Sequence, residues 1–83
     1  MDEHDIMVLL NNAVFPTEDI RDKVNELSEN YDFMPCSDIS VDLVKDSDDA
    51  IADAIKNWYN IYYVIGFVEI DDKFSKLIIR KVK

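Results

Sequence analysis

Apolar residues recur at the spacing of a helical face in three segments of the chain. The first segment carries them at i, i+3, i+4, i+7 and i+8: Ile6, Leu9, Leu10, Ala13 and Val14. This spacing predicts a first helix from Asp5 onward, with a buried strand over residues 6–10 as the alternative, because short apolar runs fit both. Pro16 interrupts the pattern, since the residue before a proline is pushed away from the helical region.

The second helical segment follows Pro16. Thr17 is placed to cap it, and the acidic side chains of Glu18 and Asp19 suit the positive end of the helix dipole in its first turn. Its apolar positions predict a buried stripe: Ile20, Val24, Leu27 and Tyr31. Residues 32–36 are turn-prone, which indicates a crossing from the helices to a sheet.

The third helical segment begins after the acidic cluster at residues 46–49, which supplies a cap and an acidic first turn. Its inward stripe consists of Ala50 or Ile51, then Ala54, Ile55 and Trp58. Its outer side carries Asp49, Asp53, Lys56 and Asn60. Because Trp58 extends the apolar stripe, we expect its side chain to be largely buried between this helix and the sheet.

Three segments have the pattern of β-strands. Residues 38–43 alternate strictly between polar and apolar side chains, as in a strand with one buried face. Residues 61–68 are rich in β-branched and aromatic side chains, and residues 71–73 form a turn-like break. Residues 74–82 fit the returning strand of a hairpin, with a terminal helix as the alternative.

The predicted order is therefore helix, helix, strand, helix, strand, strand. It gives a small α+β fold in which a three-stranded, mainly antiparallel sheet has its helices packed on one side. The 83 residues fit one domain, residues 1–83, without linker or repeat. Gly66 is the only glycine, and Pro16 and Pro35 are the only prolines, so the chain offers few breakpoints.

The chain is strongly acidic, with 18 acidic and nine basic residues and a net charge of -9. This charge predicts a basic protein partner and argues against direct contact with nucleic acid or an anionic membrane. The acidic start of the sequence differs from a signal peptide, and no apolar run approaches the roughly 20 residues of a membrane span. The lone Cys36 forms no internal disulfide, which favours a cytoplasmic location.

Candidate chemistry is sparse, and neither enzymatic activity nor a cofactor is predicted. His4 and Cys36 have no third group that would orient them as a base and nucleophile. The cluster at residues 46–49 superficially matches a calcium loop. However, Ile51 and Asn57 stand where that loop needs glycine and glutamate. A group of aromatic residues is expected to pack between helix and sheet, with an interface anchor as the alternative: Trp58, Tyr59, Tyr62, Tyr63 and Phe67.

Charge is distributed unevenly along the chain. Residues 1–72 carry all 18 acids and four bases, a net charge of -14, whereas residues 73–83 carry a charge of +5. We expect the basic segment to be an edge strand whose lysines discourage strand addition. The predicted partner-binding residues form an acidic row from a strand into the following helix: Asp38, Asp42, Asp46, Asp48, Asp49 and Asp53.

These features predict a small acidic protein-binding inhibitor. It is expected to mimic nucleic acid and block the basic groove of a nuclease or another nucleic-acid-handling enzyme. In size and charge alone, the chain is similar to phage anti-restriction and anti-CRISPR proteins and to immunity proteins of nuclease toxins. The alternative is a non-enzymatic interaction or assembly module, such as a homodimer, which an even spread of acids and an exposed apolar patch would favour.

Overall fold

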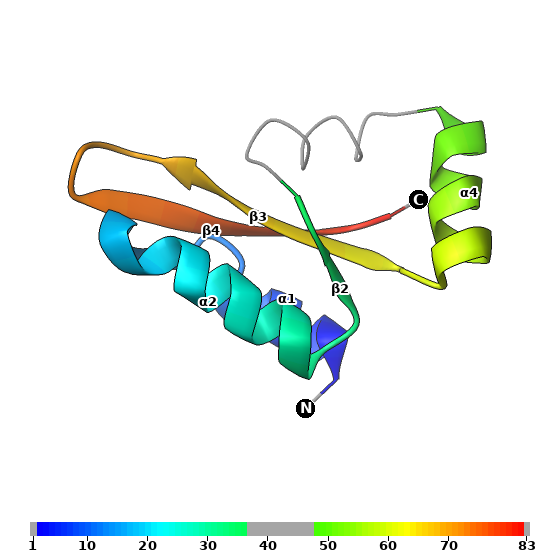
Figure 1. Cartoon of the computed structure of the whole chain (residues 1–83), viewed down its shortest axis with the longest axis horizontal. Coiled ribbons are helices and arrows are strands. Elements are labelled where there is room, and N and C mark those ends of the chain that lie inside the picture. Colours follow the sequence, from blue (N-terminus) through cyan, green and yellow to red (C-terminus); the bar gives the residue numbers. More distant parts are fainter. Residues whose placement is uncertain (1, 37–47, 83) are drawn as a thin grey trace.

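The structure is a computed structural model that describes residues 2–36 and 48–82 (Figure 1). Its elements are α1 (Glu3–Leu10), β1 (Val14–Pro16), α2 (Thr17–Asn30), β2 (Phe33–Pro35), α4 (Asp49–Tyr59), β3 (Tyr63–Glu69) and β4 (Phe74–Lys81). The α+β class is confirmed. The strand predicted at residues 38–43, together with Asp46, lies outside the described residues.

The strands form a four-stranded mixed sheet in the order β1-β4-β3-β2. Strand β2 runs parallel to β3, and the other two pairings are antiparallel. The predicted sheet had three strands, and it did not include β1 and β2, which have three residues each. Strands this short show no alternation, and β1 was hidden in the helical pattern before Pro16.

The hairpin of β3 and β4 agrees with the sequence prediction. The Asp71 Oδ1 accepts hydrogen bonds from the backbone N–H groups of Lys73 (2.8 Å) and Phe74 (2.9 Å), which fixes the turn. Residues 74–81 are a strand, so the helical alternative for this segment is wrong.

The first helix is confirmed, and the alternative of a strand over residues 6–10 is wrong. Asp2 and Asp5 form a capping box, in which each side chain accepts a hydrogen bond from the other residue's backbone N–H. The helix ends at Leu10, before Asn12 adopts a positive φ of 71°. Val14, predicted on the helical face, therefore lies in β1 instead.

Helix α2 buries the predicted residues Ile20, Val24 and Leu27, with Tyr31 half-buried just beyond its end. Thr17 is not the cap, because the helix begins directly after Pro16 and Thr17 is its first residue. The Thr17 hydroxyl instead forms a 2.9 Å hydrogen bond with the hydroxyl of Ser75, which is fully buried in β4.

The helices cover both faces of the sheet, which corrects the prediction that they pack on one side. Successive residues of a strand point to opposite faces. Ile65 and Leu77 pack with the buried side chains of α1 and α2. Val64 and Ile78 form a second cluster on the other face with the buried side chains of α4. Figure 1 shows α1 and α2 together along the sheet and α4 at one end of it.

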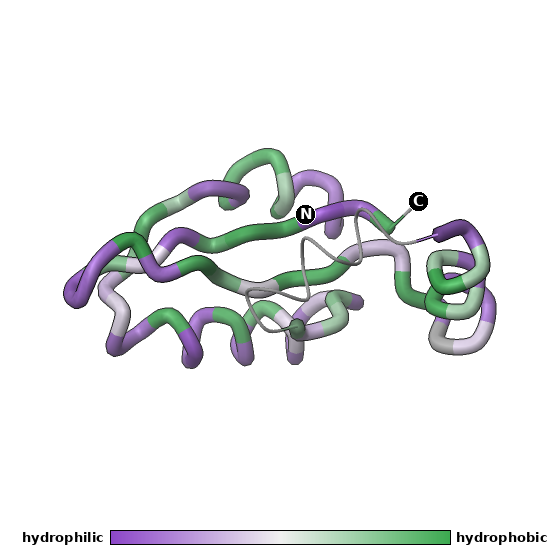
Figure 2. Tube along the Cα trace, turned by 90° about the horizontal axis from the view of Figure 1, so that it is seen from above, coloured by the Kyte–Doolittle hydropathy of each residue, from purple (hydrophilic) through white to green (hydrophobic). Residues whose placement is uncertain are grey.

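Hydropathy follows this arrangement. In Figure 2, the turns of α2 are hydrophilic along the edge that points away from the strands and carry hydrophobic colours on the side toward them, as expected for a helix with one buried side. The middle of the long strands is hydrophobic in the same view, because both of their faces are covered there. In the part of the chain that the structure describes, no helix is long and apolar enough to span a membrane.

The two edge strands end in the two prolines of the chain, Pro16 in β1 and Pro35 in β2. A proline has no N–H group to donate to an added strand, so both edges are poor templates for strand addition. The basic strand β4 lies between β1 and β3. The prediction that β4 is a lysine-protected edge is therefore wrong.

Candidate interaction surfaces

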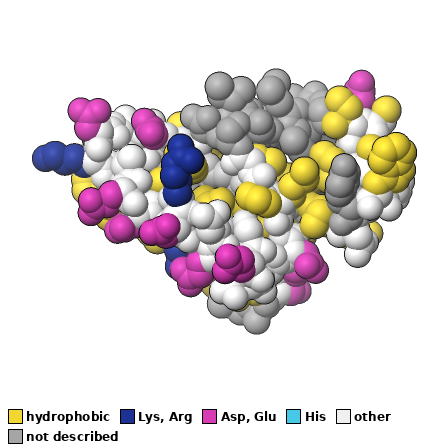
Figure 3. Space-filling view, viewed as in Figure 1, with side chains coloured by type: hydrophobic (Ala, Val, Ile, Leu, Met, Phe, Trp, Pro, Cys, Tyr) yellow, Lys and Arg dark blue, Asp and Glu magenta, His cyan; other side chains and the backbone are white. Residues whose placement is uncertain are grey.

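The outer side of α2 carries a row of carboxylates that we call the α2 row: Glu18, Asp22, Glu26 and Glu29. All four residues are exposed. Steps of three or four residues keep side chains on one side of a helix, about 6 Å apart along its axis. Because Ile20, Val24 and Leu27 fix the opposite side of α2 against the core, the row faces solvent. Figure 3 shows carboxylates along this helix and at the hairpin end.

Basic side chains of the described residues neutralise only a small part of the α2 row. Among the described residues, its one ion pair joins Lys23 Nζ to Glu26 Oε2 at 3.7 Å. A surface pair of this kind contributes little to stability. The other three carboxylates of the row form no ion pair with the side chains that the structure describes. Arg21, on the flank of α2, lies over the Phe67 ring at 5.5 Å from its centroid. The row therefore presents a negative field to an approaching protein.

The predicted acidic row is described in part. Asp48, Asp49 and Asp53 are exposed at the start of α4. The Asp48 side chain accepts a 3.0 Å hydrogen bond from the Ile51 N–H, which confirms the predicted cap. The two strand residues of the row, Asp38 and Asp42, and the first residue of the acidic cluster, Asp46, lie outside the described residues. In Figure 3, hydrophobic surface lies between the carboxylate visible on α4 and those along α2.

Trp58 is 82% exposed, so the prediction that it is buried is wrong. The sheet contacts the side of α4 that carries Ala52 and Ile55, which are 1% and 8% exposed. Ile51, which the sequence also placed inward, is 51% exposed. The apolar side of α4 is wider than the surface that covers it, and Trp58 lies on the uncovered part.

The described aromatic residues do not form one cluster. Tyr63 packs edge-on against Phe33, with ring centroids 6.2 Å apart, on the side of the sheet that faces α2. Phe67 lies under Arg21, as described above, and Tyr62 is 49% exposed. Tyr62, Tyr63 and Phe67 therefore do not pack between the third helix and the sheet, although the sequence predicted that they would. Trp58 and Tyr62 are exposed and available as interface anchors.

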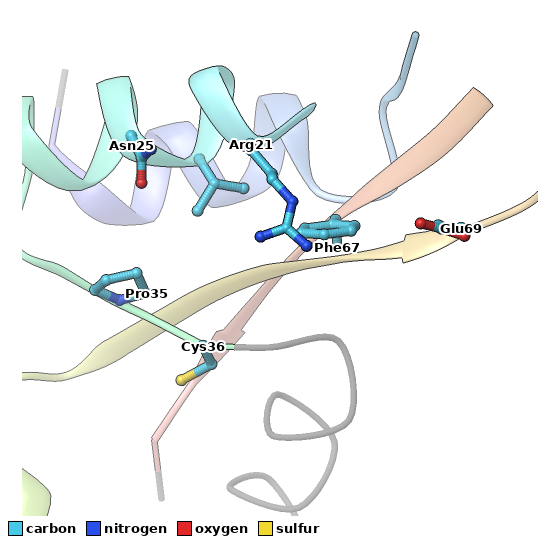
Figure 4. Close-up of a pocket in the computed structure, with 7 residues that line it drawn as sticks. Arg21, Asn25, Pro35, Cys36, Phe67 and Glu69 are labelled. Atoms are coloured by element: carbon cyan, nitrogen blue, oxygen red, sulfur yellow. The ribbon is translucent and has the colours of Figure 1, made fainter. Parts of the chain in front are cut away.

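A cavity of about 410 Å³ lies between α2, the end of β2 and β3 (Figure 4). Arg21 and Asn25 extend from α2 toward it, and Cys36 lies across from them. Burial raises the pKa of the Cys36 thiol above its ordinary value of 9.0, which keeps the less nucleophilic thiol form at neutral pH. His4 lines a different cavity, with Asp5, Val8 and Leu9. The structure therefore does not bring the thiol and the imidazole into one site.

A third cavity, of about 340 Å³, has a mixed lining: Glu3, Asp32, Asn60, Tyr62, Tyr63 and Lys81. The Glu3 Oε1 accepts a 3.1 Å hydrogen bond from the Asp32 N–H, which ties the start of α1 to the turn after α2. Within residues 2–36 and 48–82, no three His, Cys, Asp or Glu side chains are grouped so that they could hold a metal ion.

No family model matches the chain, and no match is found among curated proteins or solved structures. The candidate interaction surfaces therefore rest on the structure of this chain alone, and they are the α2 row and the uncovered side of α4. The sequence interpretation missed the α2 row as a surface because it used Glu18 and Asp19 only as first-turn acids. The i, i+4 spacing of Glu18, Asp22 and Glu26 was the signal that could have identified it.

Proposed function

We propose that the chain is a non-enzymatic, acidic protein-binding domain that inhibits a nucleic-acid-handling protein by covering its basic groove. The observation that carries this proposal is the α2 row, four exposed carboxylates on one side of a helix whose other side is anchored in the core. The proposed site of action is the cytoplasm, where the lone Cys36 remains reduced.

The proposed mechanism is electrostatic and steric. Carboxylates spaced about 6 Å apart along α2 are comparable in spacing to the phosphates of a nucleic-acid strand. They would meet the lysine and arginine side chains that otherwise hold phosphates. The net charge of -9 steers a basic partner toward the protein and raises the association rate. Occupation of the groove then excludes nucleic acid.

The acids at the start of α4 belong to the same proposal as a second contact. Asp49 and Asp53 are four residues apart, so they lie on one side of α4 and both face solvent. The Asp48 carboxylate is already engaged in the helix cap, which makes it a weaker contact for a partner. The two acidic surfaces can be separated by mutation because they lie on different helices.

Charge reversal on the two helices tests which surface binds. The basic partner is first captured from the cells of origin and identified, and its association with the purified protein is then measured directly. We expect Asp22→Lys with Glu26→Lys to slow association about tenfold or more. The matched control, Asp49→Lys with Asp53→Lys, has the same change in net charge and should have a smaller effect.

Circular dichroism of both double variants checks that the fold is retained, as expected for exposed carboxylates. Equal effects of the two variants would show that only net charge matters. An effect confined to the α4 variant would move the contact from the α2 row to Asp49 and Asp53.

The second candidate function is an interaction or assembly module without mimicry. The observation that favours it is the exposure of Trp58, a large apolar side chain outside both acidic surfaces. Exposed acids are also found on several elements, including α1, α2, α4 and the hairpin. Simultaneous binding of nucleic acid and this protein to the identified partner would favour the module, because a mimic must exclude nucleic acid.

A further inference from the structure

The cavity of about 410 Å³ between α2, the end of β2 and β3 exists because β2 is short. Strand β2 pairs only with residues 63–65, so the rest of β3 has no described strand beside it on that side. The lining combines apolar and polar side chains: Val24, Pro35 and Phe67 with Arg21, Asn25, Cys36 and Glu69. Small-molecule sites have this size and this mixture of an apolar surface with a few polar groups.

Arg21 is the one basic residue in the described lining of this cavity. Its guanidinium lies 5.5 Å from the centroid of the Phe67 ring, and this cation–π contact holds the group at the cavity. Figure 4 shows the side chain reaching from α2 into the space between the helix and the strands. Within residues 2–36 and 48–82, Arg21 forms no ion pair, although the chain has 18 acidic residues. Its charge is therefore available to an anionic ligand.

Asn25 adds a second hydrogen-bond donor on the same wall of the cavity. It follows Arg21 by four residues, so the two side chains lie on one side of α2, about 6 Å apart along its axis. Both extend toward the cavity in Figure 4. The planar guanidinium donates two parallel hydrogen bonds to the oxygens of a carboxylate, and an amide N–H group can donate a third. The wall formed by α2 therefore suits a carboxylate group.

Glu69 limits the charge that the ligand can carry. It follows Phe67 by two residues in β3, so both side chains point to the α2 side of the sheet, about 6.7 Å apart along the strand. The Glu69 carboxylate and the net charge of -9 both oppose a second negative charge on the ligand. A phosphate monoester carries a charge of about -1.5 to -2 at pH 7, so a single carboxylate is favoured over it.

We propose that this cavity binds a small aromatic monocarboxylate. Its carboxylate accepts hydrogen bonds from the Arg21 guanidinium and the Asn25 amide, and its ring packs against the apolar surface that Phe67 contributes. A small inorganic anion would leave this apolar surface in contact with water, whereas an aromatic ring buries it. The ligand is a free small molecule, and the inference is independent of the α2 row and of the basic partner.

The test is a titration of the full chain with phenylacetate, followed by NMR of the nitrogen-15-labelled protein at constant ionic strength. The usual binding energy per atom of small ligands predicts a Kd of about 1 to 10 mM. We expect the largest changes in chemical shift at Arg21, Asn25 and Phe67. The neutral analogue 2-phenylethanol should bind about tenfold more weakly or less, because it lacks the charge that Arg21 recognises.

Arg21→Gln should weaken phenylacetate binding about tenfold or more. The matched control is Lys23→Gln, which causes the same change in net charge. It removes the other α2 cation that lies over an aromatic ring, 5.8 Å from the Phe15 centroid and outside the cavity lining. This control should leave the Kd of phenylacetate within about twofold of the wild-type value. Circular dichroism of both variants checks that the fold is retained.

Three results would overturn the proposal. The first is an absence of chemical-shift changes at the cavity up to about 50 mM phenylacetate, well above the predicted Kd. The second is equal binding of 2-phenylethanol, or an equal loss of binding in Arg21→Gln and Lys23→Gln. The third is tighter binding of the peptide acetyl-Ala-Ala-Phe than of phenylacetate, which would assign the cavity to the C-terminal carboxylate of a protein instead of a free ligand.

Discussion

Asn11 connects the end of α1 to the central strand β4, and its removal should destabilise the protein strongly. Its side-chain Oδ1 accepts two hydrogen bonds, from the Ile79 N–H at 2.9 Å and from Arg80 Nη1 at 3.0 Å. Ile79 is fully buried, so water does not replace the lost acceptor there. Arg80 is half-buried, and its Nε already lacks a hydrogen-bond partner among the described residues.

The cost of Asn11→Ala follows from these two donors. Leaving a buried donor unsatisfied costs about 1 to 3 kcal/mol. We take the middle of this range for Ile79 and the lower end for the partly solvated Arg80. The free energy of unfolding should then fall by about 2 to 4 kcal/mol. For a domain of this size, that loss lowers the melting temperature by roughly 10 to 30 °C.

Thermal unfolding followed by circular dichroism measures this effect. Asn11→Asp keeps an acceptor oxygen opposite both donors and should retain most of the stability. Asn25→Ala, at an exposed position of α2, is the control and should change the free energy of unfolding by less than about 0.5 kcal/mol. A melting temperature of Asn11→Ala close to that of Asn25→Ala would refute the reasoning.

Three further predictions follow from the packing. In a double-mutant cycle, Thr17→Val and Ser75→Ala should show a coupling free energy of about 1 kcal/mol from their hydroxyl contact, and strict additivity would contradict it. Trp58→Ala should cost less than about 1 kcal/mol in urea unfolding, whereas Ile55→Ala should cost about 2 kcal/mol or more because Ile55 is buried. Burial raises the pKa of the Cys36 thiol above 9.0, so the contribution of the thiol to stability is complete below pH 9.0 and is lost as pH rises through the pKa of the folded state. The difference in unfolding free energy between wild type and Cys36→Ala should therefore be constant below pH 9.0 and change above it.

The sequence predicted those elements whose signal is long enough to be periodic. The helical stripe at Ile20, Val24 and Leu27 and the hairpin turn at residues 71–73 both appear in the structure. Strands β1 and β2 were missed because three residues are too few to show a period of two. Their pairing depends on contacts with β4 and β3, which lie far away in the sequence.

The position of Trp58 shows a different limit. Periodicity identified the apolar side of α4, but it does not specify which part of that side a sheet covers. The sheet covers Ala52 and Ile55 and leaves Ile51 and Trp58 exposed. The same limit applies to the candidate sites. Net charge predicted an acidic surface, and only the packing of α2 shows that its row faces solvent.

Competition between this protein and nucleic acid for the identified basic partner is the most direct test of the proposed function. The measurement is the anisotropy of a labelled oligonucleotide bound to the partner, followed as this protein is added. The proposal predicts full displacement of the oligonucleotide by the wild-type protein and displacement weakened about tenfold or more by Asp22→Lys with Glu26→Lys. Persistence of the oligonucleotide on a partner already saturated with this protein would contradict the proposal.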